Sequence, residues 1–326
     1  MQKPKFDSEV EAVDKLAEKY NSLHSEIKKV IIGQDEVVKN VLLSIFSKGH
    51  CLLIGVPGLA KTLLVSTIAR SLDLKFSRIQ FTPDLMPSDI TGSEILDESR
   101  QFKFVKGPVF ANIILADEIN RTPPKTQSAL LEAMQEKSVT AAGNIHKLEE
   151  PFFVLATQNP IEQEGTYPLP EAQLDRFMFN IILDYPSLED EINVVKETTG
   201  SSVEEVNKVL SGEEIIEFQK VIRNIPVPDN VLEYAVKLTA STRPDNELAK
   251  DFVKEYVSWG AGTRAGQFLI LGAKTNAVLN GKYSPDQEDV NQVAKPVLRH
   301  RILRNYKAEA EGIDVDKLID KLIDQS

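Results

Sequence analysis

The pattern of apolar and polar positions changes along this 326-residue chain, and each change predicts a different kind of element. Over residues 7–29 the apolar side chains recur at steps of three and four, which places them on one face of a helix. They are Val10, Val13, Leu16, Ala17, Tyr20 and Leu23, with Asp7 or Ser8 able to cap the start. A turn and a second amphipathic helix are predicted over residues 31–49, with Gly49 as the C-cap.

Five short apolar runs then alternate with helical patterns. The helical patterns cover residues 63–72 and 126–135, and the candidate strands cover residues 50–55, 75–81, 112–118, 151–159 and 177–184. Strands of a parallel sheet with helices on both faces have this near-continuous apolar character. The pattern predicts an α/β fold, with a doubly wound, parallel, five-stranded sheet over residues 25–185.

Strand patterns stop near residue 186, and only helical patterns follow. Helices are predicted at residues 187–199, 213–224, 229–242, 264–280, 285–304 and 314–325. Ser187, Asp229 and Ser284 are the expected N-caps, Pro285 suits a first helical position, and Pro296 is expected to kink or break its helix. The chain is therefore predicted to have two domains, residues 1–186 with the sheet and a smaller all-α domain over residues 187–326.

Two segments within the α/β domain fit neither the sheet nor its helices. Residues 82–107 contain a probable hairpin, because Phe102 and Phe104 alternate with charged neighbours. Residues 138–148 form two short runs around Ala142-Gly143-Asn144, which is also a hairpin signal. Long inserts in a compact domain are usually functional, so both are expected to carry a role.

Composition limits the classes of partner. The chain has 38 Lys and Arg against 49 Asp and Glu, a net charge of −11, which disfavours a surface built to bind nucleic acid. The first residues are too polar for a signal peptide, and no apolar run approaches the ~20 residues of a membrane helix. The single cysteine, Cys51, fits a reducing compartment. We expect a cytoplasmic protein without membrane insertion or nucleic-acid binding.

The segment GVPGLAKT, residues 55–62, is a phosphate loop with one departure. Gly55, Lys61 and Thr62 match the pattern G-x-x-x-x-G-K-[ST], and Ala60 replaces the second glycine. Backbone N–H groups at such a strand-to-helix turn hold phosphate, and the threonine hydroxyl binds Mg²⁺. If residue 60 is left-handed, alanine costs ~1–2 kcal/mol there. Because the other groups survive, we expect the loop to bind nucleotide.

Further residues at strand ends complete the predicted chemistry. In ILADE, Asp117 would hold the metal and Glu118 would act as general base, unless both are ordinary solvated acids. Asn159 could position water or sense the γ-phosphate, or could only start a turn before Pro160. No N-K-x-D or T-K-x-D segment for guanine follows, so ATP is the expected nucleotide.

Two arginines are open to more than one interpretation. Arg176 could stabilise charge in phosphoryl transfer from a neighbouring subunit, or could pair with Asp175 or Glu171. Arg264, which starts a helix of the second domain, could reach over the nucleotide or face solvent. The basic segment RHRILRN, residues 299–305, is expected to be a solvated helix face, and the four scattered histidines lack metal-ligand spacing.

Four segments together resemble the MoxR family of AAA+ ATPases. They are GVPGLAKT, ILADEINRTPPKTQSALLEAMQE, ATQNP and YPLPEAQLDRFMF, and Gly-Leu-Ala-Lys-Thr is itself a mark of that family. The resemblance is specific over residues 30–185 and moderate over the second domain, which carries GAGTRAGQ and SPDQEDV. Gly262-Thr263 stands where the family has Ser-Pro before Arg264, which weakens the role of that arginine.

The resemblance implies a role for each candidate residue. Asp117 and Glu118 would form Walker B, Asn159 sensor 1, Arg176 an arginine finger acting in trans, and Arg264 sensor 2. Thr62 and Asp117 would bind Mg²⁺. The residues expected to bind ATP are Gly33 and Gln34 near the adenine, the Walker A loop with Gly55, Val56, Pro57, Gly58, Leu59, Ala60, Lys61, Thr62 and Leu63, and Arg264.

The resemblance also implies an assembly and a class of activity. It implies a ring, usually a hexamer, that remodels protein complexes or metal-cofactor enzymes, often with a von Willebrand factor A domain protein as adaptor. Segments 82–107 and 138–148 would be the helix-2 insert and the hairpin before sensor 1. A motor subunit of magnesium-chelatase type is the main alternative. A nucleic-acid motor and a scaffold without turnover are disfavoured by the net charge and by the intact catalytic residues.

Overall fold

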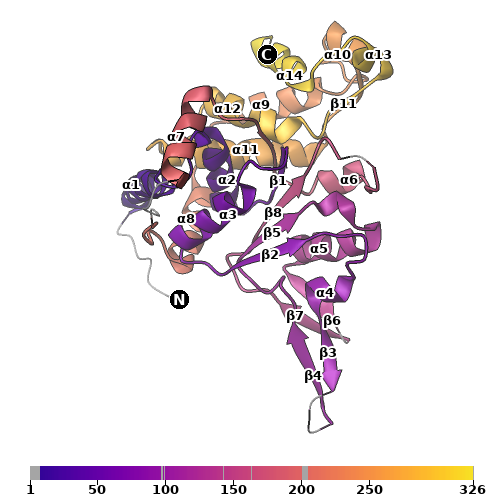
Figure 1. Cartoon of the computed structure of the whole chain (residues 1–326). Helices are drawn as coiled ribbons and strands as arrows, with labels where there is room; N and C mark the ends of the chain where they lie inside the picture. The colour runs from indigo at the N-terminus through magenta and orange to yellow at the C-terminus, as the bar shows by residue number, and fades with distance from the viewer. Residues whose placement is uncertain are drawn as a thin grey trace. The chain divides into compact units, whose positions relative to one another are not determined.

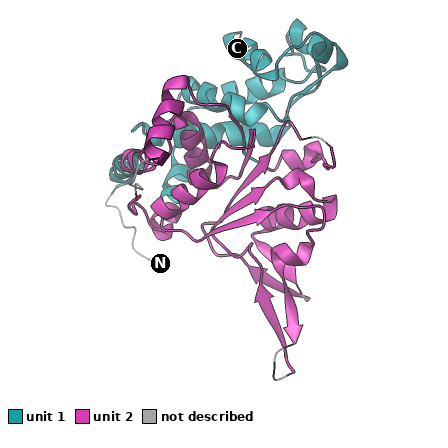
Figure 2. Ribbon diagram, viewed as in Figure 1, with its two compact units in different colours: residues 1–20, 177–180, 217–326 teal, residues 21–176, 181–216 magenta. Residues whose placement is uncertain are grey.

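The computed structural model describes residues 8–96, 98, 100–141, 143–162, 164–199 and 205–325 (Figure 1). The chain divides into two compact units (Figure 2). Unit 2 comprises residues 21–176 and 181–216, and unit 1 comprises residues 1–20, 177–180 and 217–326. These units do not follow a single boundary after residue 186, because residues 187–216 group with the sheet. The predicted domain boundary stays a prediction.

The predicted five-stranded sheet is present. Its strand order is β2-β5-β8-β1-β9, and the pairs β2–β5, β5–β8 and β1–β8 are parallel. The strands are β1 (Cys51–Gly55), β2 (Phe76–Gln80), β5 (Ile113–Asp117), β8 (Phe153–Gln158) and β9 (Phe179–Leu183). The central strands are almost wholly buried, as their apolar runs require. Their carboxyl ends therefore carry the first residues able to reach solvent.

Helices cover both faces of this sheet, as a doubly wound fold requires. Figure 1 shows α2 and α3 on one side of the sheet and α5 on the other. The helices of this part of the chain are α2 (Asp35–Phe46), α3 (Lys61–Ser71), α4 (Pro87–Thr91), α5 (Pro124–Glu136), α6 (Glu171–Leu174) and α7 (Leu188–Thr199), with a 3₁₀ turn η1 (Ile119–Arg121). The first helix of the chain, α1 (Glu9–Lys28), matches its predicted range closely; the predicted cap Asp7 lies outside the described residues.

The end of α2 differs from the predicted cap. The left-handed residue is Lys48, with φ 60°, and Gly49 is the next residue along the chain. The Gly49 N–H donates to the Ser44 carbonyl at 2.9 Å, and the Lys48 N–H donates to the Ile45 carbonyl at 3.1 Å. This pair of bonds is a Schellman motif. Gly49 therefore closes the motif without being the left-handed residue itself.

A second helix of unit 2 is also followed by a left-handed lysine, and the two lysines share one acid. Helix α5 ends at Glu136, and the next residue, Lys137, has φ 51° and donates its N–H to the Ala133 carbonyl at 3.0 Å. The Lys48 and Lys137 ammonium groups both contact the carboxylate of Glu150, at 3.0 Å and 2.9 Å. Both lysines also lie at helix C-termini, where positive charge is favourable. One acidic residue thus ties the ends of α2 and α5 together.

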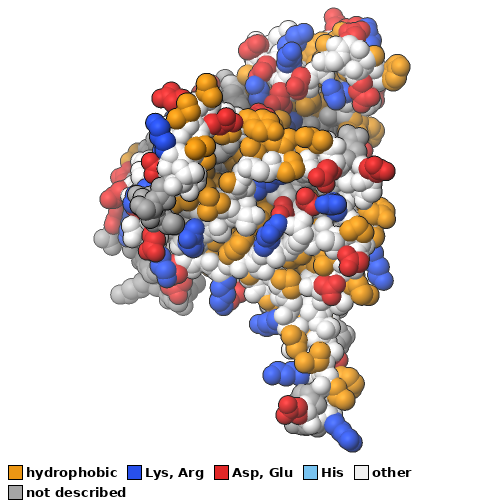
Figure 3. Space-filling view, viewed as in Figure 1, with side chains coloured by type: hydrophobic (Ala, Val, Ile, Leu, Met, Phe, Trp, Pro, Cys, Tyr) orange, Lys and Arg blue, Asp and Glu red, His pale blue; other side chains and the backbone are white. Residues whose placement is uncertain are grey.

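Both predicted hairpins are confirmed. Strand β3 (Gly92–Leu96) pairs antiparallel with β4 (Phe102–Lys106), and β6 (Ser138–Ala141) pairs with β7 (Asn144–Lys147). Phe104 of β4 stacks on His146 of β7 with ring centroids 4.0 Å apart, so the hairpins support each other. The β3–β4 hairpin projects away from the sheet, and apolar and charged side chains mix on its surface (Figures 1 and 3). Ala142, in the second predicted turn, lies outside the described residues.

Unit 1 is mainly helical, as predicted for the C-terminal region. Its helices include α9 (Asp229–Ser241), α11 (Thr263–Leu279), α12 (Gln287–Leu298) and α14 (Val315–Asp324), and α8 (Gly212–Asn224) leads into it. The sequence reading missed α10 (Asp251–Tyr256), α13 (Tyr306–Ala310) and an antiparallel pair, β10 (Val257–Trp259) with β11 (Leu303–Arg304). Across the described residues, no helix combines the length and apolarity needed to cross a membrane.

Two predicted N-caps are wrong. Pro228 precedes α9, so Asp229 is the first helical residue and not the cap. Helix α12 starts after Asp286, whose carboxylate accepts from the Asp289 N–H at 3.1 Å, while the Asp289 carboxylate accepts from the Asp286 N–H at 3.0 Å. This reciprocal capping box excludes Ser284 and Pro285 from the helix. Pro296 lies inside α12 without ending it.

The basic segment at residues 299–305 is not a solvated helix face. Arg301 is only 6% exposed, and its guanidinium donates to the carbonyls of Phe177 at 2.7 Å and Met178 at 3.3 Å. Arg299 pairs with Asp316 at 2.6 Å. The predicted surface is therefore wrong, because the guanidinium groups of Arg299 and Arg301 donate to buried carbonyl groups of residues 177–180 within unit 1.

Candidate active site

The phosphate-loop segment joins β1 directly to α3. Gly58 has φ +88° and Ala60 has φ 51° and ψ 29°, so both adopt the left-handed conformation. Residue 60 is therefore left-handed, the case considered on sequence grounds, and alanine at this position costs ~1–2 kcal/mol in backbone strain. Gly55 is needed for space, since a Cβ there would lie 2.8 Å from the carbonyl oxygen of Leu183. The chain turns tightly into the first helical residue, Lys61.

Lys61 and Thr62 start α3 beside the loop. The Lys61 ammonium group donates to the Gly55 carbonyl at 2.5 Å, so the side chain folds back over the loop. Burial lowers the pKa of Lys61, while the charges of Asp117 and Glu118 act to raise it. The lysine and the two acids, about 55 residues apart in the chain, therefore share one electrostatic environment.

Asp117 and Glu118 lie at the carboxyl end of β5 and are oriented by one hydroxyl group. The Thr157 hydroxyl of neighbouring β8 donates to Asp117 Oδ1 at 2.6 Å and accepts from the Glu118 N–H at 2.9 Å. Glu118 is left-handed, with φ 58°. This backbone conformation directs the second carboxylate away from the line of the strand. Thr157 could not be singled out from the sequence, because its role depends on the pairing of β5 with β8.

Three further residues contact the acids. Arg78 donates to Asp117 Oδ2, with Nη2 at 2.7 Å and Nε at 3.1 Å. Gln80 and Arg121 donate to Glu118 Oε2 at 3.0 Å and 2.9 Å. Arg78 and Gln80 are two residues apart on β2 and so share a face of the strand. That alternation is visible in the segment KFSRIQF, but the acidic partners become visible only with the strand register.

Asn159 follows β8 and is 6% exposed. Its Oδ1 accepts from the Ile161 N–H at 3.1 Å, which is the turn that its position before Pro160 favours. Its Nδ2 group is buried and has no hydrogen-bond partner among the described residues. A buried amide donor without a partner is costly and suits a ligand. The turn and the ligand interpretations are therefore compatible.

Arg176 is placed against α5. It donates to the Leu131 carbonyl at 3.2 Å and lines a polar pocket of about 280 Å³. The other residues of this pocket come from α5 and α6, and none belongs to the phosphate loop or the acidic pair. Arg264 is the second residue of α11 and belongs to unit 1. Neither contact pattern tests the catalytic roles of these arginines, which stay predictions.

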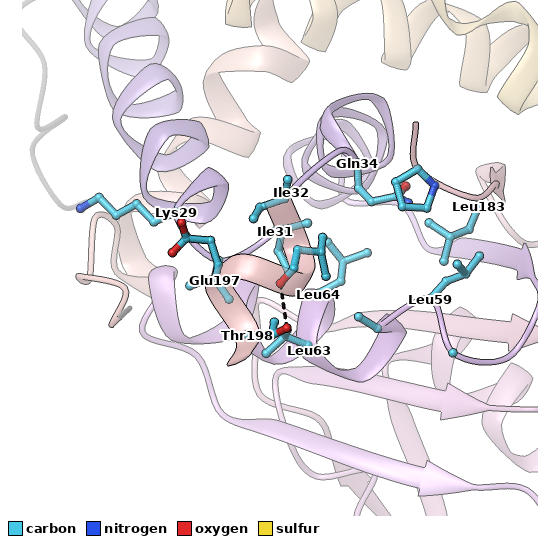
Figure 4. Close-up of a pocket in the computed structure, with 15 residues that line it drawn as sticks. Lys29, Ile31, Ile32, Gln34, Leu59, Leu63, Leu64, Leu183, Glu197 and Thr198 are labelled. Carbon is cyan, nitrogen blue, oxygen red and sulfur yellow. Dashed lines mark hydrogen bonds between the residues drawn. The ribbon is translucent and has the colours of Figure 1, made fainter. Parts of the chain in front are cut away.

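An apolar pocket of about 360 Å³ adjoins the phosphate loop (Figure 4). Leu59, Ala60 and Leu63 form one wall, and Ile31, Ile32 and Gln34 form another. Gln34 also donates to the Asp184 carbonyl at 3.1 Å. The preceding Gly33 has φ +72°, and a Cβ there would lie 2.7 Å from the Asp190 Cβ. The residues expected near adenine thus lie beside the loop.

Helix α7 supplies the rest of the pocket wall. Val194, Glu197 and Thr198 line it, together with Leu183 and Pro186, which precede the helix. The Thr198 hydroxyl donates to the Val194 carbonyl at 2.7 Å (Figure 4). These lining residues were missed on sequence grounds, because α7 was assigned to the second domain. An aliphatic pocket with few polar groups is the usual site for a planar ring.

The donors near the loop suit a hard cation. Thr62 offers a hydroxyl and Asp117 a carboxylate that is 14% exposed. In the described part of the chain, no group of three or more His, Cys, Asp or Glu could hold a metal unaided. Mg²⁺ in nucleotide sites takes one or two protein ligands and completes its shell with phosphate oxygens and water. The residues present therefore fit a nucleotide-bound Mg²⁺.

Comparison with known proteins agrees with this geometry. Residues 50–179 match the ATPase family associated with various cellular activities (AAA), and residues 249–322 match the AAA lid domain. The chain is 44% identical over 299 residues to Chaperone MoxR1 of Mycobacterium tuberculosis, covering 91% of this chain and 79% of that protein. It is 40% identical to the uncharacterized protein YeaC of Bacillus subtilis, covering 91% of each.

A solved structure shares the whole fold. The crystal structure of a proposed ATPase from Cytophaga hutchinsonii is 44% identical and superposes with a TM-score of 0.91. The match covers 97% of this chain and 96% of that one. At this identity and coverage the likeness extends over both the sheet and the helical C-terminal region.

Proposed function

Since this chain belongs to the MoxR family of AAA+ ATPases, it binds nucleotide and hydrolyses ATP, and we propose that the phosphate loop, Asp117, Glu118 and Asn159 form the catalytic site. The observation that carries this assignment is that β5, β8 and β1 are parallel neighbours, so the acidic pair, Asn159 and the phosphate loop follow the carboxyl ends of adjacent strands. One hydroxyl, that of Thr157, orients both acidic residues beside it.

The phosphates would be held by main chain and by charge. The backbone N–H groups of the loop, which Pro57 alone does not supply, would face the phosphates, and the N-terminus of α3 would add attraction for anions. Lys61 would leave the Gly55 carbonyl for the outer phosphates. Thr62 and Asp117 would hold Mg²⁺, which when bound neutralises phosphate charge. Ala60 leaves this arrangement intact, because only its backbone conformation is strained.

Glu118 and Asn159 would act on the attacking water. Glu118 would accept a proton from the water as general base. Its backbone is fixed by Thr157, and its carboxylate is held by Gln80 and Arg121. The buried Nδ2 of Asn159 would donate to the water or to the γ-phosphate, which supplies the partner it lacks. The two residues end neighbouring strands, which brings their side chains to one edge of the sheet.

The base would occupy the apolar pocket. Leu59 and Leu63 from the loop region and Val194 from α7 would contact the faces of the adenine ring. Gly33 and Gln34 would lie at the entrance segment before α2. The pocket volume of about 360 Å³ is within the range of small-molecule sites. The size and aliphatic lining of the pocket are therefore compatible with the adenine ring of ATP.

We further propose a ring of copies, hexameric as the resemblance implies. In it, Arg176 would act as an arginine finger on the nucleotide of a neighbouring copy, and Arg264 as sensor 2 on its own nucleotide. Support for Arg176 comes from its contacts, which lie with α5 and α6 and not with the loop of its own chain. Because Arg176 does not contact the phosphate loop of its own chain, it could contact the nucleotide bound to a neighbouring copy.

The chain is a MoxR-type chaperone ATPase, and the client is a matter of proposal. We propose that it remodels protein complexes or metal-cofactor enzymes in the cytoplasm, together with a von Willebrand factor A domain adaptor. The β3–β4 hairpin supports a protein client, because Phe102 is 74% exposed and Leu96 58% exposed near its tip. A motor subunit of magnesium-chelatase type is the alternative, and the identity of captured partners distinguishes the two.

The decisive variant is Glu118→Gln. It is expected to bind ATP as well as the unaltered chain and to hydrolyse it at least ~100-fold more slowly, because the general base is gone. Glu162→Gln is the matched control, since Glu162 also faces Arg121, at 3.6 Å, but has no proposed catalytic role. Phosphate release and nucleotide binding are measured for both. Normal turnover in Glu118→Gln would remove Glu118 from its role, and the trapped complex of this variant would capture clients for identification.

A further inference from the structure

The carboxylate proposed to bind Mg²⁺ is already paired with an arginine. Arg78 lies on β2, the edge strand of the sheet, and reaches Asp117 on the neighbouring strand β5. Its Nη2 and Nε both donate to Asp117 Oδ2, at 2.7 Å and 3.1 Å. Asp117 is 14% exposed and Arg78 47% exposed, so the acid is mostly buried while the arginine has a path to solvent.

The hydrogen bonds leave little room on this carboxylate. Oδ1 accepts from the Thr157 hydroxyl at 2.6 Å, and Oδ2 accepts two N–H groups from Arg78. A carboxylate oxygen offers about two lone-pair sites, so Oδ2 is filled. A cation, or a water molecule that a cation holds, has to take a site on the same carboxylate. The arginine and the cation are therefore alternatives at Oδ2.

We propose that Arg78 is the counter-ion of Asp117 in the cation-free state and competes with Mg²⁺ for Oδ2. The proposal rests on the proposed function, in which Asp117 is a metal ligand. Arg78 is a positioning residue here, because it neutralises the mostly buried Asp117 carboxylate and holds its orientation before nucleotide binds.

Gln80 gives the displaced arginine a second partner. Arg78 Nη2 also contacts Gln80 Oε1, at 2.5 Å, two residues further along the same strand. This contact does not involve the carboxylate. The guanidinium can release Oδ2 and stay hydrogen-bonded at the strand edge, which reduces the cost of the exchange.

Lys75, on the same segment as Arg78, forms an exposed ion pair that serves for comparison. Lys75 lies just before β2 and contacts Glu149 at 3.5 Å, and both side chains are 72% exposed. Such exposed pairs contribute little. Lys75 and Arg78 carry the same charge three residues apart, but only Arg78 contacts the acid at the catalytic end. Lys75→Gln is therefore a control for loss of charge alone.

The test measures cation affinity directly. Mn²⁺ replaces Mg²⁺ as the probe, and electron paramagnetic resonance counts free Mn²⁺ at a saturating level of a non-hydrolysable ATP analogue. Arg78→Gln is expected to bind Mn²⁺ about fivefold more tightly than the unaltered chain, because no guanidinium has to be displaced. Arg78→Lys, which keeps the charge but not the two-pronged contact, is expected to fall between them. Lys75→Gln is expected to leave the affinity unchanged.

The outcomes separate this proposal from the proposed function. Asp117→Asn is expected to weaken Mn²⁺ binding, and if it does not, the metal role of Asp117 fails. If Asp117→Asn weakens binding while Arg78→Gln binds Mn²⁺ no more tightly than the unaltered chain, only the competition is overturned. Equal tightening in Arg78→Gln and Lys75→Gln would also overturn it, because general electrostatics would then account for the effect. Thermal unfolding of each variant verifies that the fold is retained.

Discussion

Several single residues near the phosphate loop have two roles at once. Thr157 connects the side chain of one acid to the backbone of the next. Asn159 uses its oxygen for a turn, while its Nδ2 finds no partner in the part of the chain that the structure describes. Such residues are hard to replace, because a substitution chosen for one role disturbs the other. A useful variant keeps one contact and removes the other.

Asn159→Ser separates the two roles. The serine hydroxyl can still accept from the Ile161 N–H, so the turn is retained. The amide donor is lost, and kcat for ATP hydrolysis is expected to fall at least ~10-fold, with ATP affinity changed less than ~3-fold. Steady-state phosphate release and equilibrium nucleotide binding measure the two effects. A variant with unaltered kcat would assign Asn159 to the turn alone.

His50 makes stability depend on pH. Its Nδ1 accepts from the Val154 N–H at 3.0 Å and its Nε2 contacts the Met134 carbonyl at 3.2 Å, so the neutral ring is fully used. Burial lowers the pKa of His50 from 6.5 to about 4. The unfolded chain therefore takes up the proton first, and the free energy of unfolding falls as pH falls from about 6.5 towards 4.

The variant His50→Gln tests this dependence. A glutamine can donate and accept in place of the ring but does not titrate. Relative to the unaltered chain, the variant is expected to retain up to about 3 kcal/mol more of its neutral-pH stability at pH 4. Urea unfolding at a series of pH values gives the difference curve. Parallel curves for the two proteins would show that His50 does not carry the effect.

At the scale of elements, helix starts are set by geometry that spacing alone does not reveal. For α12 the segment SPDQED predicts Ser284 as the cap, because proline at residue 285 suits a first helical position. The structure uses Asp286, because Asp289 three residues later completes the reciprocal bond. Asp286 is also paired with Lys282 at 2.8 Å.

Substitution at the two positions should give unequal results. Asp286→Ala is expected to lower the free energy of unfolding by about 1 kcal/mol, through loss of the cap. Ser284→Ala should cost less than ~0.5 kcal/mol, as for other surface positions. Urea unfolding of both variants provides the comparison. Equal costs would mean that the capping box contributes nothing beyond an ordinary surface contact.

Elements with a strong pattern could be predicted from the sequence, and short ones could not. The apolar runs gave all five sheet strands, because a buried strand has almost no polar positions. Helices α4, α10 and α13 have five or six residues, too few to show a helical period. The segment 299–305 was wrongly predicted to be a solvated helix face, since charge alone does not reveal the carbonyl partners of Arg299 and Arg301.

For the candidate site, the predictable part was local. Residues 55–62 and 117–118 were identified because their chemistry lies within one segment. Arg78 and Thr157 belong to other strands, and their contacts depend on the register of β2 and β8 against β5. A single sequence contains no information on that register beyond the apolar pattern. The pocket wall from α7 was missed because the helix was predicted to belong to the second domain.

At the scale of the whole molecule, the proposed ring can be tested by mixing two inactive variants. Arg176→Ala would keep its own acids but lack the finger, and Glu118→Gln would keep the finger but lack the base. Each alone is expected to show less than ~1% of normal turnover. Mixed in equal amounts, the two variants should recover measurable hydrolysis. At some subunit interfaces, an intact Glu118 of one copy then meets an intact Arg176 of its neighbour.

The concentration dependence of turnover provides the companion measurement. Hydrolysis per chain should rise with protein concentration if neighbouring copies complete the site, and should follow the oligomer fraction seen by light scattering. No recovery in the mixture, together with full activity in dilute monomer, would place Arg176 outside the reaction.

The meeting of Lys48 and Lys137 on Glu150 has a consequence for how unit 2 comes apart. The Glu150 carboxylate is a shared ion-pair partner for the C-terminal ends of two helices that are distant in the chain. Without the Glu150 carboxylate, the ammonium groups of Lys48 and Lys137 lose their shared counter-ion and repel each other. Loss of the Glu150 carboxylate therefore removes one contact from the C-terminal ends of both α2 and α5 at the same time.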